Sequence, residues 1–97
     1  MFDKMKQLMD MKKQADRLKK ELDGITTEVS EVRGITIVIN GSQNFKSIEV
    51  DESLLQAGNK KGFEADMLRS MNAAIKKSQE LAAKKMRESM PAGFPGL

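Results

Sequence analysis

The sequence contains no cysteine, no histidine, no tryptophan and no tyrosine. Without cysteine the chain has no disulfide, no thiolate nucleophile and no sulfur ligand for zinc, and without histidine it lacks the commonest general base and metal ligand. Its only aromatic residues are four phenylalanines, which supply few stacking platforms for single-stranded nucleic acid. We therefore expect neither an enzyme with a small-molecule substrate, nor a cofactor, nor a metal site.

Long apolar runs are also missing. No stretch reaches the roughly 18 apolar residues of a membrane-spanning helix, and the first residues, Met1-Phe2-Asp3-Lys4, lack the apolar segment of a signal peptide. The chain of 97 residues has room for one domain. We expect a cytoplasmic protein without a membrane partner, with a single domain over residues 1–90 and a flexible tail over 91–97, which holds both prolines.

Charge is distributed unevenly along the chain. Residues 1–22 hold seven Lys or Arg against four Asp or Glu, and residues 60–97 hold eight against four. The centre, residues 23–59, holds two basic against six acidic side chains. Two basic ends around an acidic centre give the molecule a directed electric field, which suits an anionic partner.

Residues 2–22 are predicted to form a helix. They contain no Gly or Pro, and apolar residues recur at alternating steps of three and four. This N-terminal seam comprises Leu8, Met11, Ala15, Leu18 and Leu22. Asp23-Gly24 is predicted to end the helix.

The apolar period then changes to two, which predicts strands. Ile25, Thr27 and Val29 alternate with polar residues, and residues 35–39 (ITIVI) form the most apolar run and the expected central strand. Asn40-Gly41 opens a hairpin loop that leads to a third strand over residues 45–50, with Ile48 and Val50 expected to face the core. Short connections make this sheet antiparallel.

Helical spacing returns after a capped turn at residues 51–55 and an expected loop over 56–62. From Phe63 to about Ser89, apolar side chains including Met67, Leu68 and Met71 fall in an arc of about 140°. The sequence therefore predicts an α+β fold with a long N-terminal helix, a three-stranded antiparallel sheet and a long C-terminal helix.

The length of the last helix predicts self-association. A helix of 27 residues is about 40 Å long, whereas a compact domain of this size is only about 32 Å across. Apolar seams that overhang a small sheet need a partner, and a second copy supplies one. We expect a homodimer with an interface formed by Leu8, Met11, Leu18, Leu22, Ile37, Met67 and Met71.

Several segments resemble the YbaB/EbfC family of bacterial nucleoid-associated proteins. The likeness is most specific from Ile35 to Leu55 (ITIVINGSQNFKSIEVDESLL), and it extends to Asn72-Ala73-Ala74 and to the Pro/Gly/Phe segment that begins at Pro91. The resemblance implies an intertwined homodimer with helices that project like tweezers, binding to double-stranded DNA, and a place in the cytoplasmic nucleoid.

Basic side chains on the two helices are the candidate DNA contacts, because each set lies opposite an apolar arc. The candidates are Lys6, Lys13, Arg17 and Lys20 in the first helix and Arg69, Lys76, Lys77, Lys84 and Arg87 in the last, with Lys60 and Lys61 as weaker candidates. Lys-rich faces favour contacts to phosphates with weak sequence preference. The alternative is a helical protein-interaction module whose basic faces only confer solubility, and on the residues alone both hypotheses stay open.

Overall fold

The computed structural model describes residues 2–89. The elements follow the order α1 (Phe2–Gly24), β1 (Thr26–Val29), β2 (Ile35–Asn40), β3 (Phe45–Val50), the 3-10 turn η1 (Glu52–Leu54) and α2 (Lys60–Ser89). The strands form one antiparallel sheet in the order β1-β2-β3. The predicted α+β arrangement of helix, sheet and helix is confirmed, while the expected tail over residues 91–97 lies outside the described residues.

Helix α2 begins earlier than its apolar spacing predicts. Residues 60–62, expected in a loop, form its first turn, in which the backbone N–H of Phe63 donates to the carbonyl of Asn59 at 2.8 Å. The side chain of Asn59 holds this start in place, since its Nδ2 donates to the carbonyl of Leu54 at 2.9 Å. Gly62 leaves room for that side chain, because a Cβ at Gly62 would lie 2.5 Å from Asn59 Oδ1.

The core of the chain lies on one face of β2. Ile35, Ile37 and Ile39 are fully or almost fully buried, with exposed fractions of 1%, 0% and 0%, whereas Thr36 and Val38 on the other face are half-buried. Val29 on β1, paired with Ile37, completes the apolar surface under α2. The predicted central strand is confirmed, and burial alternates along it.

Small residues of α2 meet this surface. The buried side chains of the helix are Ser70, Ala74 and Ser78, spaced four apart along one stripe. Their small size lets α2 approach β1 and β2 closely, so the buried stripe is rotated by roughly 50° from the centre of the apolar arc that the sequence predicts. Met71, near the centre of that arc, and Leu68, at its far edge, are consequently exposed at 37% and 64%.

Strand β3 is left partly uncovered. Ile48 pairs with Ile37 and shares its face, as predicted, yet 46% of it is exposed because α2 packs on β1 and β2. An irregularity in the β2–β3 register pairs Phe45 with Ile39, and Phe45 is exposed at 37%. Arg69 and Ala73 lie on the side of α2 next to β1, so helix geometry places Met71 and Leu68 on the other side, about 60° and 120° from the buried stripe. We call Phe45, Ile48, Leu68 and Met71 the β3–α2 patch.

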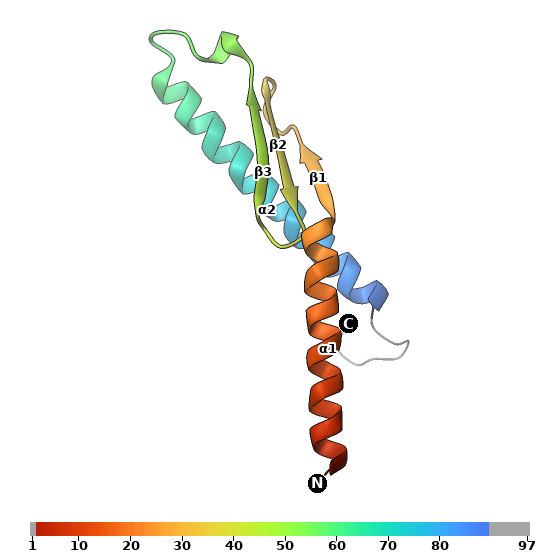
Figure 1. Ribbon diagram of the computed structural model, residues 1–97. Helices are drawn as coiled ribbons and strands as arrows, with labels where there is room; N and C mark the ends of the chain where they lie inside the picture. The colour runs from red at the N-terminus through yellow and green to blue at the C-terminus, as the bar shows by residue number, and fades with distance from the viewer. Residues whose placement is uncertain (1, 90–97) are drawn as a thin grey trace.

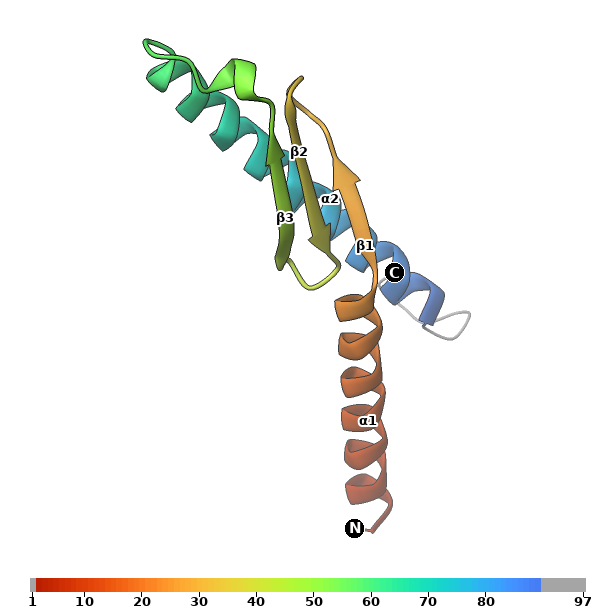
Figure 2. The same ribbon diagram turned by 45° about the horizontal axis from the view of Figure 1, so that its top comes forward.

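Helix α1 projects away from the sheet, whereas α2 crosses behind it (Figures 1 and 2). The chain is accordingly elongated, with extents of 67 × 21 × 18 Å. Within α1 only Leu18 and Leu22, near its C-terminal end, are half-buried, and every other residue from Asp3 onward is exposed. The rest of the N-terminal seam therefore lies bare in the single chain.

Asn40 fixes the base of α1 to the rest of the molecule. Its Nδ2 donates to the carbonyl of Asp23 at 3.2 Å, and its Oδ1 accepts from the backbone N–H groups of Ser42 and Asn44. Its own carbonyl accepts from Ser78 Oγ at 2.7 Å. One buried amide residue thus joins α1, the hairpin loop and α2.

The hairpin loop makes a second connection to α1. The N–H of Gly41 donates to the carbonyls of Leu22 and Ile25 at 3.0 and 2.9 Å, and Ser42 Oγ donates to Asp23 Oδ1. A Cβ at Gly41 would lie 3.0 Å from the carbonyl oxygen of Leu22, so this close approach favours glycine. The Asn-Gly pair therefore forms the predicted turn and also anchors a helix.

Candidate nucleic-acid interface

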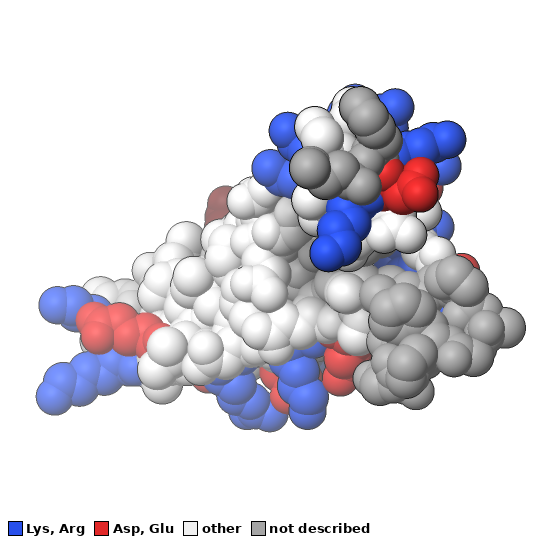
Figure 3. Space-filling view, turned by 90° about the horizontal axis from the view of Figure 1, so that it is seen from below, with Lys and Arg blue, Asp and Glu red and all other residues white. Residues whose placement is uncertain are grey.

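The basic set on α1 is fully accessible. Lys6, Lys13, Arg17 and Lys20 are all exposed, because this helix projects from the sheet. A view from below, along α1, shows Lys and Arg side chains on several sides of the helix (Figure 3). A second group of basic side chains lies on the opposite side of the molecule, and a band of uncharged residues separates the two groups.

The basic set on α2 is also exposed, and its members Arg69, Lys76 and Lys77 line one open groove between α2 and the end of β1. Asn72 lies among them on the same groove. The remaining members, Lys84 and Arg87, lie further along the helix toward its C-terminal end. The structure thus brings three of the five predicted α2 residues together.

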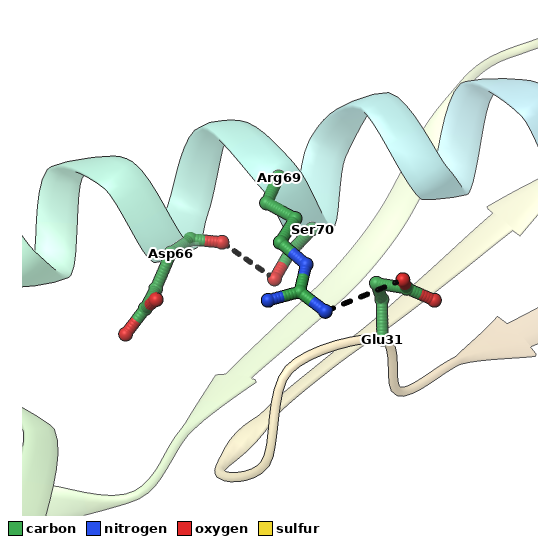
Figure 4. Close-up of polar contacts among 4 residues, drawn as sticks. All are labelled: Glu31, Asp66, Arg69 and Ser70. Carbon is green, nitrogen blue, oxygen red and sulfur yellow. Dashed lines mark hydrogen bonds and ion pairs between the residues drawn. The ribbon is translucent and has the colours of Figure 1, made fainter.

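Two acidic side chains border this groove. Arg69 Nη2 lies 3.7 Å from Glu31 Oε1, which follows β1, and Lys77 Nζ lies 3.7 Å from Glu80 Oε2 (Figure 4 shows the first pair). Figure 4 also shows Ser70 Oγ, which donates to the carbonyl of Asp66 at 2.8 Å within α2. Both ion pairs are solvent-exposed, and pairs of this kind are weak enough for phosphates to replace the carboxylates.

The two basic sets approach each other where the helices meet. Arg17 and Leu18 of α1 line a shallow groove with Ser89 at the end of α2, and Lys85 Nζ lies 3.7 Å from Glu21 Oε2. Arg17 is therefore the member of the α1 set nearest to the end of α2. Lys6 and Lys13 lie farther out on the projecting part of α1.

The weaker candidates lie at the other end of α2. Lys60 and Lys61 are exposed in its first turn, and Lys60 Nζ lies 3.9 Å from Glu64 Oε1. No groove found in the described part of the chain includes these lysines together with Arg69, Lys76 or Lys77. They are separate from both principal sets.

Asp51 caps the 3-10 turn η1. The backbone N–H and the hydroxyl of Ser53 hydrogen-bond to Asp51 and hold the pKa of its carboxyl below the ordinary value, which fits this role. Across residues 2–89, His, Cys, Asp and Glu form no group of three that could hold a metal ion. None of the described helices is long and apolar enough to cross a membrane.

The residues predicted for self-association lie at four places. Leu8 and Met11 are exposed on the free part of α1, at 66% and 65%, while Leu18 and Leu22 are half-buried near its base. Met71 belongs to the β3–α2 patch. Met67 packs against the core, and Ile37 is buried inside the single chain.

The predicted DNA contacts omit three lysines of α1. Lys4, Lys12 and Lys19 lie close to the N-terminal seam in helical projection, and a covered seam would make them less accessible. Since α1 projects freely, all three are exposed beside the predicted set. Their exposure follows only from the direction in which α1 projects, which the sequence does not show.

Comparison with known proteins agrees with these features. The profile of the YbaB/EbfC DNA-binding family matches residues 1–94. A protein of Syntrophobacter fumaroxidans named as a nucleoid-associated protein is 29% identical over 86 residues, which cover 88% of this chain and 78% of that protein.

The fold also occurs among solved structures. The crystal structure of an uncharacterized protein from Helicobacter pylori superimposes with a TM-score of 0.67. The match covers 86% of this chain and 98% of that one, at 19% sequence identity. At this identity the likeness concerns the fold alone.

Proposed function

This chain belongs to the YbaB/EbfC DNA-binding family, and on that premise we propose that it is a nucleoid-associated protein that binds double-stranded DNA as a homodimer. Its contacts are Lys and Arg side chains on phosphates, and its place is the nucleoid, within the cytoplasm. The name of the Syntrophobacter fumaroxidans relative supports this role.

The observation that carries the proposal is the exposure of both basic sets on long helices. The α1 set lies along one face of a projecting helix, and the α2 set lines the side and outer surface of a helix whose small residues pack on the sheet. Lysine heads on flexible stems neutralise phosphates without reading base edges. We therefore propose binding with weak sequence preference.

The β3–α2 patch supports the homodimer. Its four apolar side chains lie on one side of the sheet, exposed by 37% to 64% in the single chain. Monomeric proteins rarely leave contiguous apolar surface of this kind bare. We propose that a second copy covers the patch, with Met71 in the interface, and that Met67 and Ile37 support the interface from within the core.

A gel-shift experiment on unrelated duplexes at several salt concentrations tests DNA binding. If each dimer neutralises about four to six phosphates, log affinity falls with log salt at a slope near −4 to −5. Similar affinities for the unrelated duplexes are expected. Salt-independent retention would contradict the phosphate mechanism, and a strong preference for one duplex would contradict weak sequence preference.

Charge reversal locates the contacts. Lys13→Glu with Lys77→Glu is expected to weaken binding severely, and addition of Lys20→Glu and Lys84→Glu to abolish it. The matched control is Arg33→Glu with Lys46→Glu, which changes the net charge equally but lies in the acidic centre of the chain. Equal effects of the two double variants would show that only net charge matters.

The alternative function remains a defined outcome of this test. If the quadruple variant retains DNA like the parent, the basic faces only confer solubility and the protein-interaction module is favoured. The observation that favours the protein-interaction module is the exposure of residues of the N-terminal seam. A partner protein that survives nuclease and high salt during purification would identify that function.

A further inference from the structure

Asn40 is, by its chemistry, the asparagine of this chain most prone to lose its side-chain amide. The backbone nitrogen of the following residue can attack the amide carbon of an asparagine and form a cyclic imide, and a following glycine hinders this attack least because it has no Cβ. The other asparagines of the chain precede Phe45, Lys60 and Ala73, and only Asn40 precedes a glycine. Spontaneous deamidation is therefore expected first at Asn40-Gly41.

The last turn of α1 holds both groups that would react. Asn40 Nδ2 donates to the carbonyl of Asp23 at 3.2 Å, and the N–H of Gly41 donates to the carbonyl of Leu22 at 3.0 Å. Both carbonyls lie at the end of a helix, where no donor within the helix remains for them. The nitrogen that would leave and the nitrogen that would attack are thus both bound to α1.

Further hydrogen bonds fix the same two groups. Asn40 Oδ1 accepts from the N–H groups of Ser42 and Asn44 at 3.0 and 2.9 Å, and the N–H of Gly41 also donates to the carbonyl of Ile25 at 2.9 Å. Only 1% of Asn40 is exposed. Ring closure requires the Gly41 nitrogen to lose its proton and the Asn40 side chain to turn toward it, and these bonds oppose both changes.

We propose that Asn40-Gly41 is a deamidation site that reacts only when the last turn of α1 separates from the hairpin loop. After separation, the Gly41 nitrogen loses its proton and bonds to Cγ of Asn40, and Nδ2 leaves as ammonia. Water then opens the cyclic imide at either of its carbonyls, which leaves an aspartate or an isoaspartate at position 40. One water is consumed and one ammonia is released.

The product disfavours the return of α1. One carboxylate oxygen at position 40 can still accept from the hairpin loop, but the other faces the carbonyl oxygen of Asp23 with no hydrogen between them. The C-terminal end of a helix carries partial negative charge, which repels this carboxylate, and burying the charge costs further free energy. Deamidation therefore converts a transient detachment of α1 into a lasting one. This site is separate from the DNA contacts and from the β3–α2 patch.

Mass spectrometry of peptides that contain residue 40 tests whether the fold protects the site, because replacing the amide by an acid raises the mass. At mildly alkaline pH, the folded parent is expected to deamidate at residue 40 at least about tenfold more slowly than the parent unfolded in guanidinium chloride, since the reaction waits for a rare local opening. Equal rates in the folded and unfolded parent would overturn the proposal.

A matched pair of variants tests the role of α1. Leu22→Gly weakens the last turn of the helix, where the Leu22 side chain lies against Gly41, and Leu8→Gly makes the same change in the free part of α1. Deamidation is expected to be about fivefold faster in Leu22→Gly than in the parent and unchanged in Leu8→Gly, while circular dichroism shows that both variants fold. Equal rates in the two variants would show that α1 does not control the site.

Hydrogen exchange tests the effect of the product. Asn40→Asp reproduces one product, and Asn44→Asp makes the same charge change at an exposed position of the same loop. The Gly41 N–H is expected to exchange about tenfold faster in Asn40→Asp than in the parent, and at nearly the parent's rate in Asn44→Asp. An unchanged rate in Asn40→Asp would show that α1 stays attached after deamidation and would overturn this part of the proposal.

Discussion

At the scale of single residues, the core depends on a few isoleucines of β2, of which Ile37 is the central one. Its exposed fraction is 0%, and it contacts neighbours on both flanking strands through the pairs with Val29 and Ile48. Ile37→Ala is expected to lower the free energy of unfolding by about 2–5 kcal/mol, measured by urea denaturation. Val38→Ala, one residue along on the half-buried opposite face, is the control and should cost clearly less.

The hairpin loop contains a backbone conformation that suits glycine. Gln43 has a φ of 64°, which side chains other than glycine adopt at a cost. Gln43→Gly is therefore expected to stabilise the protein by a few tenths to about 1 kcal/mol in thermal or urea unfolding. The same change at Gln56, whose φ is not positive, is expected to destabilise it because glycine adds freedom to the unfolded chain. Stabilisation by both variants would show that the gain does not come from the positive φ of Gln43.

Burial on β2 could be predicted from the sequence, but the role of Asn40 could not. Alternation of β-branched residues identifies Ile35, Ile37 and Ile39 as core because a strand turns every second side chain to the same face. Asn40 is recognisable only as part of a turn. Its partners Asp23 and Ser78 are 17 and 38 residues away, so only the tertiary structure brings them together.

At the scale of elements, both helices and all three strands could be predicted, whereas the rotation of α2 could not. Helical periodicity identifies an apolar arc, but it does not show which part of that arc touches the sheet. Ser70 and Ser78 occupy the contact because small side chains allow a close approach. The start of α2 was also missed, since Gly62 reads as a loop residue until the position of Asn59 is known.

The groove on α2 offers a test of how its ion pairs limit DNA binding. Glu31→Gln removes the carboxylate 3.7 Å from Arg69, so the guanidinium becomes available to a phosphate. DNA affinity is expected to rise about threefold at low salt, with a steeper salt dependence. Gel shifts measure both quantities.

The control for this variant is Glu28→Gln, an exposed position on β1 that lines none of the described grooves. It makes the same change in net charge. If it raises affinity as much as Glu31→Gln does, the gain comes from net charge, and the ion pair to Arg69 has no specific influence.

At the scale of the whole molecule, the β3–α2 patch predicts the oligomeric state. Light scattering of the parent is expected to give about twice the chain mass of 10.8 kDa at micromolar concentration. Leu68→Lys with Met71→Lys places two charges in the patch and should give the mass of a single chain, while circular dichroism shows that the helices remain.

Ala83→Lys provides the control, because it adds charge to an exposed position of the same helix outside the β3–α2 patch. It should leave the dimer intact. A parent with the mass of one chain at every concentration would contradict the dimer, and dissociation by Ala83→Lys would show that the interface lies elsewhere on α2.

The direction in which α1 leaves the sheet could not be predicted from the sequence. The length of the helices indicates that they overhang a small sheet, but local periodicity contains nothing about the angle at which α1 leaves it. That angle depends on hydrogen bonds of Asn40 and Gly41 to residues at the base of the helix. The predicted basic residues of α1 were thus identifiable, while their positions in space were not.

The attachment of α1 at its base, through Asn40 and the hairpin loop, makes the helix a lever arm. Its 23 residues extend about 35 Å, so a tilt of only about 10° at the base moves the N-terminal end by roughly 6 Å. Successive phosphates along one DNA strand are separated by about 3.4 Å of helix axis. A small angular error at the base of α1 is thereby amplified to almost two phosphate spacings, so the stiffness of this attachment limits how accurately the outermost lysines meet the DNA backbone.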